Sequence, residues 1–191
     1  LVGYTPQYEL APDLLKSFDV NDGRIFTFTL RKGHRWSDGK PFTTEDFRYW
    51  WEDMVLNKEM SPEGPLVDML VEGQPPKVEI IDMETIRYSW DKPNPFFLPA
   101  IAGATQLMIY RPAHYLKRFH KRHVEPEKLA AEIAKRKRRD WVDLHFNRDR
   151  TARLDNPDVP ALDPWVNTTP SPSERFIFQR NPYFHRVDTA G

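Results

Sequence analysis

The stretch from Asn21 to Met54 constrains this chain more than any other part of the sequence. Residues 21–23 read Asn-Asp-Gly, a tight-turn pattern, because Asn and Gly tolerate positive φ. Residues 25–31 then alternate apolar and polar side chains, which is typical of a half-buried strand. Residues 16–20 alternate in the same way before the turn. The two runs are therefore predicted to pair as a hairpin.

A capped helix is predicted directly after this hairpin. Thr43 suits the N-cap position, and Asp46 places a carboxylate near the positive end of the helix dipole. Apolar residues then recur at helical spacing: they are Phe47, Trp50, Trp51, Met54 and Val55. The sequence thus predicts a hairpin plus a capped amphipathic helix over residues 16–56.

A small α/β subdomain is predicted at residues 78–110. Residues 78–80 and 86–90 alternate in polarity and read as a second hairpin. Residues 96–104 then read as a short buried helix, and residues 107–110 as a short strand.

Residues 111–153 differ in composition, because Lys and Arg cluster there. Pro126 at a first-turn position starts a helix, so this segment is predicted to be a basic helical insertion. Its charges are most simply the solvated face of a helix. The alternative is a nucleic-acid or anionic-surface binding protein that uses residues 117–139. That alternative lacks a recognised nucleic-acid motif, and the formal net charge of the chain is zero.

The last part of the chain, residues 156–191, reads as a Pro-rich connector and a returning strand. Residues 174–180 alternate, and we expect this strand to rejoin the sheet of the first hairpin. The alternation of hairpins and helices along the whole chain predicts a mixed α/β (α+β) fold with a mixed sheet and flanking helices.

Two motifs in the first third of the chain carry a family resemblance. Phe-Thr-Phe-Thr-Leu-Arg-Lys-Gly (26–33) and Trp-Ser-Asp-Gly-Lys-Pro-Phe-Thr-Thr-Glu-Asp-Phe (36–47) resemble the motif of the family 5 extracellular solute-binding proteins. Residues 180–184 resemble that family's Arg-Asn-Pro-Tyr-Phe strand and turn, which leads into a second lobe. The resemblance implies a periplasmic-binding-protein type II-like fold, with residues 1–191 as a partial N-terminal lobe of a longer, two-lobe protein.

The resemblance also implies a function. Members of this family capture small solutes outside the cytoplasmic membrane and deliver them to the permease subunits of an ABC importer. An oligopeptide is the first expectation for the solute, with a sugar or a metal complex as alternatives. A periplasmic or extracellular location is implied, with lipid anchoring as one form of the full-length protein. The chain opens without a basic-then-apolar leader, so a processed or trimmed polypeptide is expected.

Two places are candidate ligand contacts. In peptide-binding relatives the segment after the capped helix approaches the ligand groove, which points to Met60, Ser61, Pro62 and Glu63. A solvent loop is the alternative interpretation of these four residues. Trp165, on the rigid connector, is predicted to face the ligand, or else to anchor its own loop.

Catalytic and metal chemistry are not expected. The chain has no Cys, and no nucleophile is paired with a base in a recognisable order. His114, His120 and His123, with His145 farther on, lack metal-ligand spacing and are interpreted as charged surface residues. Asp19, Asp22 and Asp38 lie near predicted turns, which explains them without a catalytic role. The sequence therefore predicts a protein that is not an enzyme and needs no metal or cofactor.

Overall fold

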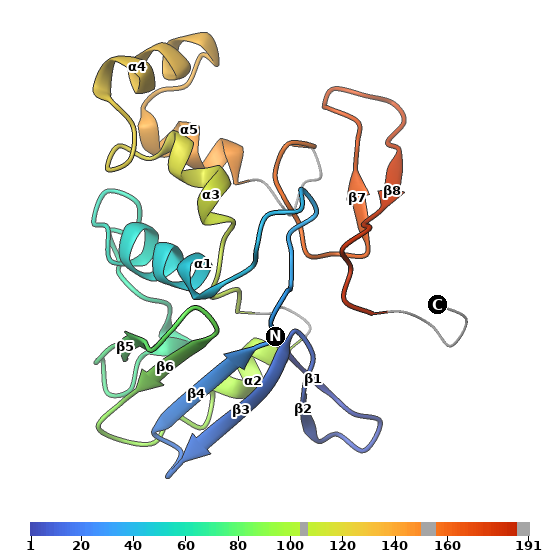
Figure 1. The fold of residues 1–191 in the computed structure, drawn as a ribbon. Coiled ribbons are helices and arrows are strands. Elements are labelled where there is room, and N and C mark those ends of the chain that lie inside the picture. Colours follow the sequence, from blue (N-terminus) through green and yellow to red (C-terminus); the bar gives the residue numbers. More distant parts are fainter. Residues whose placement is uncertain (104–106, 150–155, 187–191) are drawn as a thin grey trace. The chain divides into compact units, whose positions relative to one another are not determined.

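The computed structural model describes residues 1–103, 107–149 and 156–186 (Figure 1). The chain divides into two compact units. The first unit comprises Leu1–Gly33 and Thr43–Arg111, and the second comprises His34–Phe42 and Pro112–Gly191.

A four-stranded antiparallel sheet forms the centre of the first unit. Its strands are β3 (Leu15–Asn21), β4 (Ile25–Leu30), β6 (Thr85–Ser89) and β5 (Lys77–Ile80), in the order β3-β4-β6-β5. Both predicted hairpins are confirmed. The sequence did not predict that β4 pairs with β6 and so joins them into one sheet.

An aromatic cluster covers one face of this sheet. Phe97 belongs to helix α2 (Phe97–Ala102), and its ring centroid lies 5.3 Å from that of Phe26 and 4.9 Å from that of Trp90. Phe28 and Tyr88 complete the cluster, and both are fully buried. Edge-to-face and tilted ring contacts of this kind add to the gain from burying the rings. The core of the first unit is therefore aromatic.

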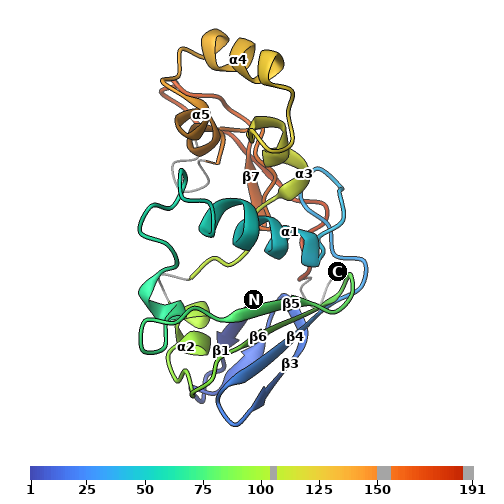
Figure 2. The same cartoon turned by 90° about the vertical axis from the view of Figure 1, so that its left-hand side faces the viewer.

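The helix predicted after the first hairpin is present, but it changes type midway. Helix α1 (Thr44–Arg48) begins with the predicted cap: the Thr43 side chain accepts from the backbone, and the Asp46 carboxylate accepts from the N–H of Thr43 at 3.1 Å. It continues as a π-helix, η1 (Tyr49–Val55), rather than as the expected α-helix. Figure 2 shows this helix running along one side of the sheet.

The π-helical part is buried on nearly all sides, whereas a surface α-helix buries one stripe of side chains. In η1, all residues but Glu52 are buried, including Asp53. The closing hydrogen bond runs from the N–H of Leu56 to the carbonyl of Trp51, which is the i→i+5 spacing of a π-helix.

The rest of the first unit is short elements and extended chain. Strands β1 (Val2–Tyr4) and β2 (Leu10–Pro12) form a separate pair, and a single helical turn, η2 (Val67–Met69), follows the Pro- and Gly-rich loop.

The strand predicted at residues 107–110 is absent. The N–H of Leu107 donates to Ala100, and that of Arg111 donates to Asp46, so these ends of the segment bond to helical elements rather than to a strand. The predicted helix at 96–104 is confirmed as α2, and residue 104 lies outside the described residues.

The second unit is mostly helical over the predicted insertion. Its helices are α3 (Ala113–Leu116), η3 (Lys117–Phe119), α4 (Pro126–Lys135) and α5 (Trp141–Arg148). Pro126 starts α4 as predicted, and the Asp140 carboxylate caps α5 by accepting from the N–H of Asp143 at 2.8 Å. Residues 150–153 of the predicted insertion lie outside the described residues.

A buried arginine ties these helices to the connector. The guanidinium of Arg148 donates to the hydroxyl of Tyr115 at 2.6 Å, to the amide oxygen of Asn156 at 2.7 Å and to the carboxylate of Asp158 at 2.7 Å. A buried charge needs such partners, because an unpaired one is costly.

The returning strand at the end of the chain does not join the first sheet, which corrects the sequence prediction. Strand β8 (Phe178–Arg180) pairs instead with β7 (Trp165–Asn167), and the two form a separate antiparallel sheet. The partner strand lies within the Pro-rich connector itself. Pairing across a short loop costs less chain entropy than pairing with a distant strand.

The cap of α1 supports a first prediction. Thr43→Ala removes the side-chain acceptor of the capping box and should lower the free energy of unfolding by about 1 kcal/mol. Urea denaturation followed by circular dichroism measures this change. Thr43→Ser keeps the acceptor and should leave stability nearly unchanged; equal losses in both variants would contradict the role of the cap.

Candidate ligand-binding surface

A shallow pocket lies beside the β7–β8 sheet, within the second unit. Its volume is about 230 Å³. One wall is the turn at residues 36–39, which the connector holds in place. The N–H of Ser37 donates to the carbonyl of Ala161 at 2.9 Å, and the N–H of Ala161 donates to Ser37 Oγ at 3.0 Å. The other lining residues come from the connector and the two strands: Asp38, Pro157, Asp158, Val159, Pro160, Val166, Thr168, Gln179, Arg180 and Pro182.

The tight conformation of this turn depends on Gly39. Its φ is 82°, in the left-handed region that favours glycine. A Cβ built on Gly39 would lie 3.1 Å from the hydroxyl oxygen of Tyr183, so a side chain would also crowd that ring. The Asp-Gly pair of the motif thus shapes one wall of the pocket.

The pocket carries charges of both signs. Asp38 uses one carboxylate oxygen to accept from the N–H of Lys40 at 3.1 Å, and the other lies 2.7 Å from Nε2 of His114. Arg180 brings the opposite charge to the pocket, and its guanidinium makes no hydrogen bond or ion pair to the described part of the chain. A carboxylate and an open guanidinium in one pocket suit a ligand that has both a donor end and an acceptor end.

Trp165 lies on the same small sheet and is 58% exposed. It pairs with Arg180 in the register, and Phe178, 39% exposed, pairs with Asn167. Because directly paired residues share a face, Trp165, Phe178 and Arg180 lie on one side of the sheet. The exposed indole favours the ligand-facing interpretation of Trp165, which stays a prediction.

The other predicted contacts, Met60 to Glu63, belong to the first unit. Met60 is buried at 6% exposure, and the N–H groups of Met60 and Ser61 both donate to the carbonyl of Asn57. Pro62 and Glu63 are exposed, and Ser61 is half-buried. Met60 therefore packs inside its loop, so residues 61–63 are the ones that remain accessible to a ligand.

Sequence reasoning did not select Arg180 and Gln179, and it assigned Asp38 only to its turn. The available signal was the motif at residues 180–184, which begins with the arginine. Because residues 38 and 180 are far apart in the sequence, no spacing pattern indicates that both line one pocket.

The histidines do not form a metal site within the described residues: no three His, Asp or Glu side chains there are grouped to hold an ion. The interpretation of His120 and His145 as surface residues is wrong, because they are 1% and 0% exposed. The ring of His120 packs edge-to-face on Trp141 at 4.7 Å. A buried imidazole against an indole is a packing role, whereas His123 is exposed as predicted.

Membership of a family follows from comparison with known proteins. Residues 9–190 match the family described as bacterial extracellular solute-binding proteins, family 5 Middle. The chain therefore belongs to the family 5 solute-binding proteins, as its motifs predicted. Within the described residues, no helix is both long and apolar enough to cross a membrane.

Particular relatives cover nearly the whole chain. The periplasmic alpha-galactoside-binding protein of Rhizobium meliloti is 31% identical over 96% of this chain and 24% of its own length. A solved structure of an oligopeptide-binding protein OppA is 34% identical, with a TM-score of 0.81, over 96% of this chain and 28% of the other. The structure of MelB from Agrobacterium fabrum C58 in complex with stachyose is 26% identical with a TM-score of 0.69, over 96% of this chain and 25% of the other. These matches confirm the predicted mixed α/β fold class, but the predicted mixed sheet is wrong, because all strand pairs in the described residues are antiparallel.

The chain spans about a quarter of the length of these relatives. All three are named as binding proteins rather than enzymes, and they give no support to the nucleic-acid alternative.

The exposure of Trp165 leads to a stability prediction. Trp165→Ala should change the free energy of unfolding by no more than about 0.5 kcal/mol, because the indole is largely in water. Trp90→Ala removes a buried ring whose Nε1 donates to the carbonyl of Met69, and it should cost about 3–5 kcal/mol. Urea denaturation of both variants measures the difference. A large loss in Trp165→Ala would mean that Trp165 anchors its loop.

Proposed function

We propose that this chain is a partial N-terminal lobe of the substrate-binding component of an ABC importer, which captures small solutes outside the cytoplasmic membrane and delivers them to the permease. The family match over residues 9–190 is the observation that carries the proposal. The role is binding rather than catalysis, in keeping with the names of the relatives.

The size of the pocket supports a site shared between two lobes. Ligand pockets in proteins usually enclose about 300–1,000 Å³. The pocket beside β7–β8 holds about 230 Å³ and opens to solvent. In the proposed mechanism a second lobe closes over this surface. A solute that touches both lobes favours the closed state, because its affinity for that state is higher than its affinity for the open state. The closed form then docks on the permease.

An oligopeptide is the proposed solute. The match to the oligopeptide-binding protein OppA, at 34% identity and a TM-score of 0.81, supports this choice. The polar groups of the pocket have the matching chemistry: Asp38 can accept from an amine or amide N–H, and the Arg180 guanidinium can bind a carboxylate or a carbonyl.

An oligosaccharide that contains galactose is a second candidate. The relative from Rhizobium meliloti is named as an alpha-galactoside-binding protein, and the MelB structure contains stachyose. The exposed indole of Trp165 offers a flat apolar face for the C–H side of a sugar ring.

Calorimetry tests the shared site. Residues 1–191 alone should bind tripeptides and stachyose weakly or not at all, because one lobe cannot close on a solute. A longer polypeptide, which adds the remaining length of the relatives, should bind one of the two classes. Micromolar or tighter binding by residues 1–191 alone would contradict the two-lobe mechanism.

Variants in the longer polypeptide identify the contacts. Arg180→Gln should weaken binding of a peptide by about tenfold, the effect of losing a charge-assisted hydrogen bond. Trp165→Ala should weaken binding of stachyose more than binding of a peptide. Lys137→Gln, on an exposed residue that does not line the pocket, is the control. Unchanged affinity in both site variants would exclude this surface.

A further inference from the structure

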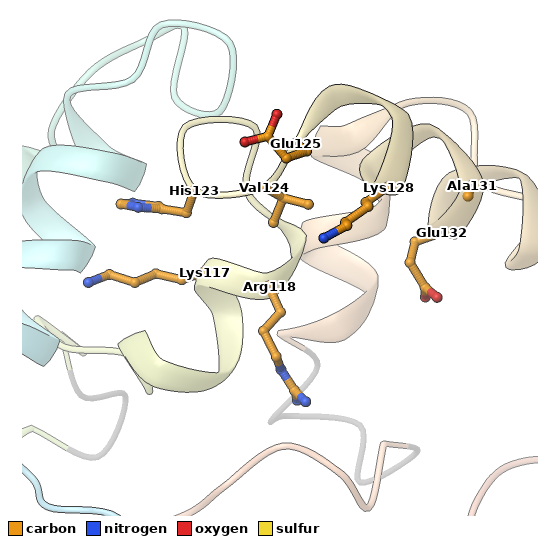
Figure 3. Close-up of a pocket in the computed structure, with 8 residues that line it drawn as sticks. All are labelled: Lys117, Arg118, His123, Val124, Glu125, Lys128, Ala131 and Glu132. Carbon is orange, nitrogen blue, oxygen red and sulfur yellow. The ribbon is translucent and has the colours of Figure 1, made fainter.

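A second and larger pocket lies in the helical part of the second unit, between η3 and the start of α4. Its volume is about 830 Å³ (Figure 3). Figure 3 shows the side chain of Lys128 directed from α4 toward η3, where the side chain of Arg118 begins. The lining residues are Lys117, Arg118, His123, Val124, Glu125, Lys128, Ala131 and Glu132.

Cations dominate the charge of this pocket, although the chain as a whole is neutral. Three cations, Lys117, Arg118 and Lys128, line it together with two carboxylates, Glu125 and Glu132. One of these, Glu132, is already paired on its own helix. It accepts from Nε of Arg136 at 3.0 Å and lies 3.6 Å from Nζ of Lys135.

The hydrogen bond from Arg136 lowers the pKa of Glu132, so that carboxylate stays ionised and occupied. The remaining field in the pocket is positive.

Arg118 is held in position before any partner arrives. Its guanidinium carbon lies 4.5 Å from the centre of the Tyr115 ring and 5.5 Å from that of Phe119. Its Nε donates to the carbonyl of Tyr115 at 3.1 Å. The terminal amino groups make no hydrogen bond or ion pair to the residues that the structure describes. A stacked guanidinium with an open end loses little side-chain entropy when it binds a carboxylate.

The start of α4 adds to the attraction for an anion. Pro126 occupies the first turn of this ten-residue helix, and no side chain caps it. Its first N–H groups and the positive end of the helix dipole therefore lie at the pocket wall, beside Glu125 and Lys128. Lys128 is exposed, and its ammonium group makes no hydrogen bond or ion pair to the described residues.

We infer that this pocket is a docking site for an acidic segment of a protein partner, with carboxylate side chains bound by Arg118 and Lys128. This inference rests on the proposed function, which supplies the partner: the outer face of the importer's permease. Val124 and Ala131 give the wall apolar contacts that a polypeptide can use. Glu125 adds a repulsive charge that disfavours a compact, multiply charged anion more than a single carboxylate.

A binding assay with a synthetic peptide rich in Glu tests the inference, with its Gln-substituted counterpart as the reference ligand. Residues 1–191 should bind the Glu peptide with a strong dependence on salt, and the Gln peptide much more weakly. Lys128→Glu should weaken binding of the Glu peptide by about tenfold, and the double variant Arg118→Glu, Lys128→Glu should weaken it further.

A matched control separates this pocket from diffuse attraction. Lys137→Glu with Arg138→Glu changes the net charge as much as the double variant does, in the same basic segment, but neither residue lines the pocket. The control should bind within about twofold of the wild type. Arg118→Gln covers the case in which a reversed charge under the Tyr115 ring disturbs folding, and circular dichroism checks each variant.

Three results would overturn the inference. The first is equal loss of binding in the control and pocket variants. The second is inorganic phosphate that displaces the peptide at equal concentration, which would make the pocket a free-anion site. The third is a combination of results: the protein sediments with phosphatidylglycerol vesicles, the pocket variants do not, and the Glu peptide fails to bind. That outcome would assign the pocket to a lipid surface.

Solute binding is measured separately in the longer polypeptide. If the longer polypeptide binds no solute, the proposed function fails, whatever the peptide assay shows. If it binds solute normally but the Glu peptide does not bind the pocket, only the docking inference fails.

Discussion

The pairing of β4 with β6 is the interaction on which the first unit depends. A two-stranded hairpin is marginally stable by itself in water. The pairing joins two hairpins that are far apart in the sequence and aligns Phe26 with Tyr88 and Phe28 with Ile86. These aligned side chains form the buried face on which the Phe97 ring packs. Without this register, the aromatic cluster would not form, and α2 would have no apolar surface of the sheet to pack on.

In the second unit, a buried network of hydrogen bonds with an ion pair joins the helices to the connector. Its helices are short, and the chain between them and β7 is rich in proline. The Arg148 guanidinium connects Tyr115 on α3 with Asn156 and Asp158 on the connector. Those connector residues lead directly into the wall of the pocket beside β7–β8. A polar network therefore positions the candidate ligand surface, and it does so through geometry that apolar contacts would not specify.

Local patterns in the sequence predicted the local elements well. Alternation predicted both hairpins, Thr43 and Asp46 predicted the cap of α1, and Pro126 predicted the start of α4. Such local patterns do not predict the contacts between segments that are distant in the sequence. Apolar residues at helical spacing do not distinguish a π-helix from an α-helix in η1, and alternation does not say with which strand β8 pairs. The pocket that holds Asp38 and Arg180 combines residues too far apart for any spacing rule to join.

The two units are interleaved along the polypeptide, since residues 34–42 of the second unit interrupt the first. During synthesis, the turn at residues 36–39 is therefore made long before the helices of the same unit. All residues of the first unit are present once Arg111 has been made, whereas the bonds between Ser37 and Ala161 form only after the connector has been made. No single cut in the gene separates one unit from the other. Exchanging one unit alone would need breakpoints at three places in the chain, after residues 33, 42 and 111.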